Sequence, residues 1–271
     1  MSAKRAAFFI DGFNLYHSIA SVRGFKKYKW LNLRSLCEKF TTTHEKTCDV
    51  YYFTAYATWK PESASRHRAY VAANRHFGCT PIFGKFIEKD RVSRVACNQP
   101  CNPENNKSKC GKTFTAHEEK LTDVNIAVHL LKTCVKGECD ALYLMTGDND
   151  LIPALLTAHE LCPEINIRLI LPFRARSRNL VTVCRENGFK YMSIKEVHLS
   201  ESLLPAAVND GKNTYTCPPE WAYHIAREEQ SGNKNDPFYN AANMQRLDHS
   251  IQQMTERKYV SKTMDELEKI P

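Results

Sequence analysis

FFIDGFN, at residues 8–14, is a short apolar run that ends abruptly in a carboxylate, Asp11, and soon afterwards an amide, Asn14. Similar short apolar runs alternate with helix-like stretches through the first 195 residues, and this alternation predicts an α/β domain built on a mostly parallel sheet. The strands are expected at 7–10, 50–55, 82–87, 141–145 and 167–171, and the helices at 33–40, 64–77, 118–132, 152–161 and 177–187.

Capping residues give one helix a predicted starting point. Thr115 and Glu118 have the spacing of a capping box, in which each side chain bonds the backbone at a helix start. Apolar residues follow at helical spacing, so the helix is predicted to begin near Ala116. Asp123 would then lie within its first two turns, on the same face as Glu119.

Two stretches interrupt the alternation. Residues 88–117 are polar and rich in cysteine, asparagine and lysine, and they are expected to form an insertion in a crossover connection. Prolines break the chain after residue 200. We therefore expect a main domain over 4–200, a domain-closing segment over 201–221 and an accessory polar tail with weak helical periodicity over 222–271.

The composition excludes several classes of protein. The chain has 271 residues, of which 42% are hydrophobic and 25% charged, so it can bury a sizeable core and is not expected to be disordered throughout. Its candidate apolar run at 6–10 is far shorter than the roughly 20 residues that a transmembrane helix needs, and it lacks the pattern of a signal peptide. The 11 cysteines are odd in number and irregularly spaced, which favours reduced thiols in a cytoplasmic protein.

The net charge of +8 is unevenly distributed. Residues 1–100 carry 17 basic and 7 acidic side chains, whereas residues 101–150 carry 6 basic and 8 acidic ones. A basic chain with an acidic middle segment fits a polyanionic partner, and it equally fits a solvated surface with scattered charges.

Carboxylates follow two of the expected strands. In open α/β sheets the ligand site lies beyond the carboxyl ends of the strands, where Asp11 with Asn14, and Asp148 with Asp150, are found. Each aspartate alone also fits a turn or a helix cap. If Asp123 turns inward to meet them, their mutual repulsion is relieved by a hard divalent cation, Mg²⁺ or Mn²⁺. Such a site suits phosphoryl chemistry.

Other α/β chemistries lack their motifs in this chain. It has no G-x-x-x-x-G-K-[ST] and no G-x-G-x-x-G after the first strand, so P-loop and dinucleotide sites are not indicated. It also has no G-x-S-x-G nucleophile elbow.

Three segments of the chain form a recognisable set: FFIDGFNLYHS at 8–18, HEEKLTDVNIAVHLL at 117–131 and LYLMTGDNDLIPALLTA at 142–158. Together they resemble the signature blocks of the NYN domain, a branch of the PIN-like ribonuclease superfamily. Their order and spacing fit that family, and LLP…G…CPPEW at 203–221 is similar to the end of the domain in bacterial members. The resemblance covers about residues 4–221 and implies a PIN-like, Rossmann-type three-layer sandwich around a central, mostly parallel sheet.

The resemblance also implies a metal-dependent ribonuclease. Asp11, Asp123 and Asp148 would be its acidic ligands, with Asp150 as a further acidic contributor and Asn14 as a polar partner that orients metal or water. Some relatives carry a pair of acidic residues where this chain has a threonine before Asp123, so one or two bound metal ions both stay open.

A second metal site is indicated within the insertion. Cys97, Cys101, Cys110 and His117 supply four ligands within 21 residues, which suits tetrahedral zinc. Their spacing, C-x3-C-x8-C-x6-H, is looser than that of a zinc finger, and Cys79 is an alternative to His117. An exposed loop that simply carries thiols is the other interpretation. A structural Zn²⁺ would fix this loop beside the active-site helix.

Basic residues suited to RNA phosphates fall in three groups, at 23–30, at 66–68 and at Arg174, Arg176 and Arg178. Aromatic residues within the first group suit base stacking. Lys120 is expected as an ion-pair partner or phosphate contact among the acidic residues. A solvated charged face would account for the same basic residues.

Two functions follow from these patterns. The first is a cytoplasmic endoribonuclease that uses Mg²⁺ or Mn²⁺ on single-stranded or structured RNA, alone or as a homo-oligomer. The second is an RNA-binding or regulatory adaptor that keeps the fold and cuts slowly or not at all.

Overall fold

The computed structural model of the chain describes residues 3–92, 113–175 and 177–222. These residues all belong to one compact unit, 1–223. Four of the predicted site residues, Cys97, Cys101, Cys110 and Arg176, lie outside the described residues, as does nearly all of the predicted tail.

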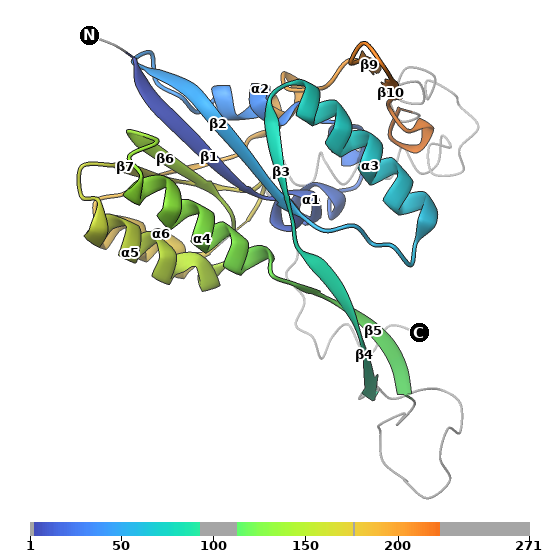
Figure 1. Cartoon of the computed structure of the whole chain (residues 1–271), viewed down its shortest axis with the longest axis horizontal. Helices are drawn as coiled ribbons and strands as arrows, with labels where there is room; N and C mark the ends of the chain where they lie inside the picture. Colours follow the sequence, from blue (N-terminus) through green and yellow to red (C-terminus); the bar gives the residue numbers. More distant parts are fainter. Residues whose placement is uncertain (1–2, 93–112, 176, 223–271) are drawn as a thin grey trace, which may run out of the picture. The chain divides into compact units, whose positions relative to one another are not determined.

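Six parallel strands form the central sheet (Figure 1). Their order across the sheet is β3-β2-β1-β6-β7-β8, and every neighbouring pair is parallel. The chain builds one half outward from β1 and then starts the other half beside β1, so the topological switch point lies between β1 and β6. The strands are β1 (Lys4–Asp11), β2 (Glu45–Thr54), β3 (Cys79–Phe83), β6 (Ala141–Met145), β7 (Asn166–Leu171) and β8 (Lys190–Ser193).

Helices cover both faces of this sheet, each with its own apolar core (Figure 1). One face carries α1 (Gly12–Ala20), α2 (Leu33–Glu38), α3 (Pro61–His76) and the short α7 (Glu196–Ser200). The other face carries α4 (Thr122–Val135), α5 (Ile152–Leu161) and α6 (Arg178–Glu186). The predicted three-layer α/β architecture with a central parallel sheet is therefore confirmed.

Strand β1 shows why the apolar run at its core is uninterrupted. Ala6, Phe8 and Ile10 pack into one core, and Ala7 and Phe9 pack into the other, because successive side chains of a strand point to opposite faces. A strand covered on both faces needs apolar residues at every position. The run ends where β1 leaves the core, at the first polar side chain of the predicted site.

A two-stranded antiparallel ribbon leaves the sheet at the end of β3 (Figure 1). It consists of β4 (Lys85–Val92) and β5 (Thr113–Lys120), paired residue by residue along their whole length. The expected strand at 82–87 is therefore two strands, separated at Gly84. Both flanks of the predicted insertion at 88–117 belong to this ribbon, and its cysteine-containing part lies outside the described residues.

The predicted helix start near Ala116 is wrong. Thr115 and Glu118 lie in β5, opposite Asp90 and Ile87 of β4, and α4 begins only at Thr122. A capping box is a local signal, and here the backbone hydrogen bonds of a complete strand pair replace it.

The segment after residue 200 packs against the connection between α1 and α2 and against α3. The Leu204 N–H donates to the carbonyl oxygen of Trp30 (3.0 Å), and the Asn32 N–H donates to that of Ser202 (2.8 Å). A small hairpin, β9 (Ala207–Asn209) with β10 (Thr214–Thr216), follows. Trp221 then packs near Trp30 and Tyr70. Through these contacts the predicted domain-closing segment, residues 201–221, packs against the rest of the domain.

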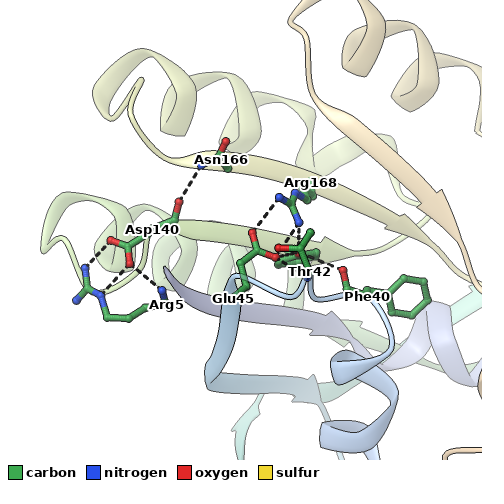
Figure 2. Close-up of polar contacts among 8 residues, drawn as sticks. Arg5, Phe40, Thr42, Glu45, Asp140, Asn166 and Arg168 are labelled. Atoms are coloured by element: carbon green, nitrogen blue, oxygen red, sulfur yellow. Dashed lines mark hydrogen bonds and ion pairs between the residues drawn. The ribbon is translucent and has the colours of Figure 1, made fainter. Parts of the chain in front are cut away.

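A buried ion pair ties three strands together near their amino ends (Figure 2). The Glu45 and Arg168 side chains are 2% and 11% exposed. Nη1 and Nη2 of Arg168 each lie 2.9 Å from an oxygen of the Glu45 carboxylate. The Tyr143 hydroxyl donates to the same carboxylate at 2.6 Å. Burial alone would raise the pKa of Glu45, but its hydrogen bonds and the guanidinium hold that pKa below its usual value. Arg5 and Asp140 form a more exposed pair nearby.

The described cysteines, eight in number, are all free thiols. Within the described residues, no helix is both long and apolar enough to cross a membrane.

Candidate metal centre

Asp11, at the end of β1, is held by a set of hydrogen bonds. Its side chain is buried, with 2% exposed. Its Oδ1 accepts the Asn14 N–H (3.0 Å), and its Oδ2 accepts from Asn14 Nδ2 (2.6 Å) and from Thr146 Oγ1 (2.9 Å). Gly12 permits this geometry, because a Cβ there would lie 2.5 Å from the carbonyl oxygen of Phe53. The carboxylate orientation is thus fixed from both α1 and the loop after β6.

The loop after β6 presents Asp148 beside Asp11. Asn14 Oδ1 accepts the Gly147 N–H (3.2 Å), and Thr146 Oγ1 accepts the Asp148 N–H (3.1 Å). Asp148 Oδ1 in turn accepts the N–H of Asp150 (3.0 Å) and caps the short 3₁₀ helix η2 (Asn149–Leu151). The two aspartates therefore lie at neighbouring strand ends, at the switch point of the sheet.

Glu119 and Asp123 come from the junction of β5 and α4. Leu121 between them has φ 80°, in the left-handed region that residues other than glycine rarely adopt. This turn lets Glu119 accept the N–H of Thr122 (3.1 Å) and, in a short hydrogen bond, its hydroxyl. Asp123 then lies in the first turn of α4. Gly84 leaves room for this junction, since a Cβ there would lie 2.7 Å from Glu119 Oε1.

These elements enclose an acidic cavity of about 350 Å³. Four carboxylates line it, and no described lysine or arginine does. Asp150 is exposed and is not part of the lining. The polar lining consists of Asp11, Asn14, Asp123, Asp148, Glu119, Thr122, His17 and His117.

The carboxylates of this acidic cavity perturb one another. Burial raises the pKa of Asp11, and its hydrogen bonds oppose that rise. Burial also raises the pKa of Asp123 to about 6, and the charges of Asp11, Asp148, Glu119 and Asp150 add to the rise. Convergence of these groups, which the sequence only suggested, is therefore present in the fold.

The donor set of the acidic cavity suits a hard divalent cation. Carboxylate and amide oxygens are the ligands that Mg²⁺ and Mn²⁺ prefer. The buried Nε2 of His117 makes no hydrogen bond within the described residues and borders the same cavity. No three described His, Cys, Asp or Glu side chains form a ready-made metal cage, so the carboxylates would have to draw together around an ion.

His117, the predicted fourth zinc ligand, lies on β5 at the rim of the acidic cavity. Its ring stacks on Trp59, with centroids 3.8 Å apart, and its Nε2 lies 3.4 Å from Glu88 Oε1. Cys79, the alternative ligand, is buried in the apolar core at the start of β3. Because the other three cysteines lie outside the described residues, the zinc site stays a prediction.

Lys120, Arg174 and Arg178, which are the described residues among the predicted phosphate contacts near the site, do not line the acidic cavity. Lys120 pairs with Glu118, with Nζ 3.3 Å from Oε2. Arg174 and Arg178 are exposed in the connection from β7 to α6 and at the start of α6. An RNA contact at these two arginines stays a prediction.

Comparison with known protein families assigns the chain to one of them. The NYN domain description matches residues 5–189, which include all four carboxylates of the acidic cavity. The chain belongs to the NYN domain family. NYN domains have a PIN-like, nuclease-type fold, and they are generally nuclease or hydrolase domains related to RNA. The family predicted from the sequence is therefore confirmed.

Two individual proteins are similar to this NYN domain protein. It is 26% identical to the 6-hydroxy-3-succinoylpyridine 3-monooxygenase HspA of Pseudomonas putida (strain DSM 28022 / S16), over 80% of this chain and 75% of that protein. It also resembles the crystal structure of a protein of unknown function, VPA0982, from Vibrio parahaemolyticus RIMD 2210633. That structure has a TM-score of 0.46 and 13% identity, over 74% of this chain and 97% of the other.

Sequence reasoning missed or misplaced several members of the site, among them Thr146, His17 and His117. Thr146 directly follows an apolar run, so the rule that found the aspartates could have found it. His17 lies one helical turn after Asn14, and a helical projection of α1 would have placed both on one side. His117 was expected to serve the insertion, and its position beside the carboxylates depends on the β4–β5 pairing.

Proposed function

We propose that this NYN domain protein is a metal-dependent ribonuclease that cuts within RNA chains. One observation carries the proposal. Carboxylates from β1, β5, α4 and the loop after β6 share one cavity at the switch point, with no lysine or arginine among the described residues of its lining. Burial first, and then the charges of the neighbouring carboxylates, raise the pKa of Asp123, so ionisation of the whole cluster is opposed. Phosphodiester hydrolysis commonly uses cations held by carboxylates of this kind.

We assign cation binding to Asp11, Asp123 and Asp148, with Glu119 as a fourth carboxylate. When bound, Mg²⁺ or Mn²⁺ supplies a Lewis acid that lowers the pKa of water and neutralises phosphate charge. The hydrogen bonds from Asn14 and Thr146 support the assignment, because they keep the Asp11 carboxylate in one orientation. A fixed ligand reduces the reorganisation needed on binding.

The two histidines of the acidic cavity are the candidates for proton transfer. Histidine is the side chain that most often serves as a general acid or base. We assign to His17 or His117 the acceptance of a proton from the attacking water or its return to the leaving ribose oxygen. Because its Nε2 makes no hydrogen bond within the described residues, His117 is favoured over His17.

Cleavage of a labelled RNA with single-stranded and hairpin segments tests the proposal. The full chain with Mn²⁺ is expected to give internal cleavage products, and EDTA is expected to stop their formation. Asp11→Asn and Asp148→Asn are each expected to lower the rate roughly a hundredfold or more, with unchanged circular dichroism. Glu186→Gln is the matched control, because this exposed carboxylate lies at the end of α6. Undiminished activity in both aspartate variants would place the chemistry elsewhere or reveal a contaminant.

The same preparation separates the adaptor hypothesis from the nuclease. An adaptor would bind RNA in a salt-sensitive manner, equally in the wild type and in both aspartate variants. It would also give no cleavage products with Mn²⁺.

Oxygenation of a small aromatic ring is a second candidate, favoured by the similarity to the Pseudomonas monooxygenase over most of the chain. It predicts consumption of O₂ and of a two-electron reductant such as NADH in the presence of 6-hydroxy-3-succinoylpyridine, the compound in that protein's name. Oxygen uptake without RNA cleavage would favour this function over the nuclease.

A further inference from the structure

A second cavity adjoins the acidic one. It has a volume of about 370 Å³, within the range of typical ligand pockets. The two cavities share Phe13, His17 and Phe86. The walls of this second cavity come from α1, the 3₁₀ helix η1 (Phe25–Lys29), the end of β2, α3 and Trp221. A molecule bound here would extend to the edge of the candidate metal centre.

The charge of the second cavity is opposite to that of the first. Lys29, Lys60 and Arg66 line it, and no described carboxylate does. Lys29 Nζ lies 3.2 Å from the Tyr16 hydroxyl and 4.6 Å from the centre of its ring. Within the described residues neither lysine forms an ion pair, whereas Arg66 pairs with Glu220 at 3.2 Å. Two lysines from different elements are therefore available to an anion.

The remaining walls suit a flat ring with polar edges. Aromatic side chains from α1, η1, β2, α3 and β4 line the second cavity together with Trp221. Aromatic faces and edges bind nucleobases without regard to sequence. His67 adds an uncharged polar group, because burial lowers its pKa to about 4. Its Nε2 lies 3.2 Å from the hydroxyl of Thr54. Neutral imidazole and hydroxyl groups can each donate and accept a hydrogen bond.

We propose that the second cavity binds one nucleotide of the RNA, with the base between the aromatic walls and a phosphate on Lys29 and Lys60. This inference rests on the proposed ribonuclease function. It adds that one nucleotide of the RNA substrate binds next to the candidate metal centre. A nucleotide accounts for three observations together: an aromatic lining, two lysines that form no ion pair within the described residues, and continuity with a cavity suited to a metal-bound phosphate. A polynucleotide carries the next phosphate into that acidic cavity.

Calorimetric titration of the full-length Asp148→Asn variant in EDTA tests this subsite without cleavage or metal. The probes are UMP, CMP, AMP and GMP, the matching nucleosides, inorganic phosphate and 6-hydroxy-3-succinoylpyridine. At least one monophosphate is expected to bind roughly tenfold more tightly than its nucleoside and than phosphate, because base and phosphate are bound together. Lys29→Glu is expected to weaken that binding roughly tenfold to a hundredfold.

Two further variants keep the test decisive. Lys190→Glu makes the same charge change at an exposed position on β8 and is expected to leave binding unchanged. Ala57→Phe places a bulky ring in the second cavity without changing charge and is expected to weaken binding at least as much as Lys29→Glu. Circular dichroism of each variant verifies folding.

Three results would overturn the inference. They are no saturable binding of any monophosphate, equal affinity for a monophosphate and for phosphate alone, and binding of 6-hydroxy-3-succinoylpyridine in place of the nucleotides. RNA cleavage by the wild type with Mn²⁺ is measured separately. Cleavage without nucleotide binding removes the subsite and leaves the nuclease, whereas nucleotide binding without cleavage removes the nuclease and leaves the subsite.

Discussion

Replacing Asp123 by asparagine is expected to stabilise the metal-free protein. Burial, followed by the neighbouring carboxylates, raises the pKa of Asp123 from 3.8 to about 6, so the folded state opposes its ionisation. At about 1.4 kcal/mol per pKa unit, the ceiling of the effect is about 3 kcal/mol. Solvent screening at this partly exposed group, and a helix-dipole contribution of about 0.3–1 kcal/mol that the variant loses, reduce the expected gain to about 1–2 kcal/mol.

The stability gained by the Asp123→Asn substitution is expected to depend on pH. An acid with a higher pKa in the folded state than in the unfolded state binds more protons when folded, so folding loses stability as pH rises. For Asp123 the loss begins near pH 4 and is complete somewhat above pH 6, its folded pKa being about 6. The variant is therefore expected to match the wild type near pH 4 and to exceed it at pH 7.

Urea unfolding in EDTA, followed by circular dichroism from pH 4 to pH 8, measures this difference. Asp150→Asn is the matched control. Its exposed carboxylate is the last contributor to the Asp123 shift, so we expect a change of only a few tenths of a kcal/mol. Two results would refute the convergence of these carboxylates. One is a lower stability of Asp123→Asn than of the wild type at pH 7, and the other is a stability difference between the two proteins that persists undiminished at pH 4.

Three further predictions concern the candidate metal centre and the buried ion pair. Saturating Mn²⁺ is expected to stabilise the wild type by about 2.7 kcal/mol at a hundredfold excess over Kd and Asp123→Asn by much less; equal thermal shifts in both would count against a site at Asp123. Arg168→Met leaves the buried Glu45 without its partner and is expected to cost about 3 kcal/mol or more in urea unfolding, part of which Glu45→Gln in the same chain should restore. Gly84→Ala sets a Cβ 2.7 Å from Glu119 Oε1 and is expected to weaken Mn²⁺ binding in calorimetry. Gly137→Ala, where no atom lies within 4 Å, should change stability but not Mn²⁺ affinity.

The sequence was most informative where burial is complete. β1, β2, β6 and β7 were all found, because strands covered on both faces require continuous apolar runs that solvent-exposed segments do not show. The aspartates that follow β1 and β6 were found by the same logic, since polar residues at the ends of parallel strands gather at one edge of the sheet. Both inferences need only the local pattern and the class of the sheet.

Elements that depend on partners were not predictable in this way. β8 (Lys190–Ser193) lies at the edge of the sheet and is largely exposed, so it lacks an apolar run. β5 was read as a helix because the spacing of Thr115 and Glu118 is a local signal, whereas the β4 partner is separated from it by the insertion. The second cavity combines α1, η1, β2 and α3, and no short stretch of sequence records such a combination.

The β4–β5 ribbon is attached to the domain at two junctions that lie beside the acidic cavity. The ribbon joins the domain at Gly84 and at Leu121, and Leu121 lies between Glu119 on the ribbon and Asp123 on α4. The acidic cavity thus takes Glu119 from the ribbon and its other three carboxylates from the domain. A rotation of the ribbon about these two joints would change the distance of Glu119 from the other three carboxylates. Whatever binds the outer end of the ribbon, at residues 92 and 113, is therefore expected to alter the affinity of the proposed cation site.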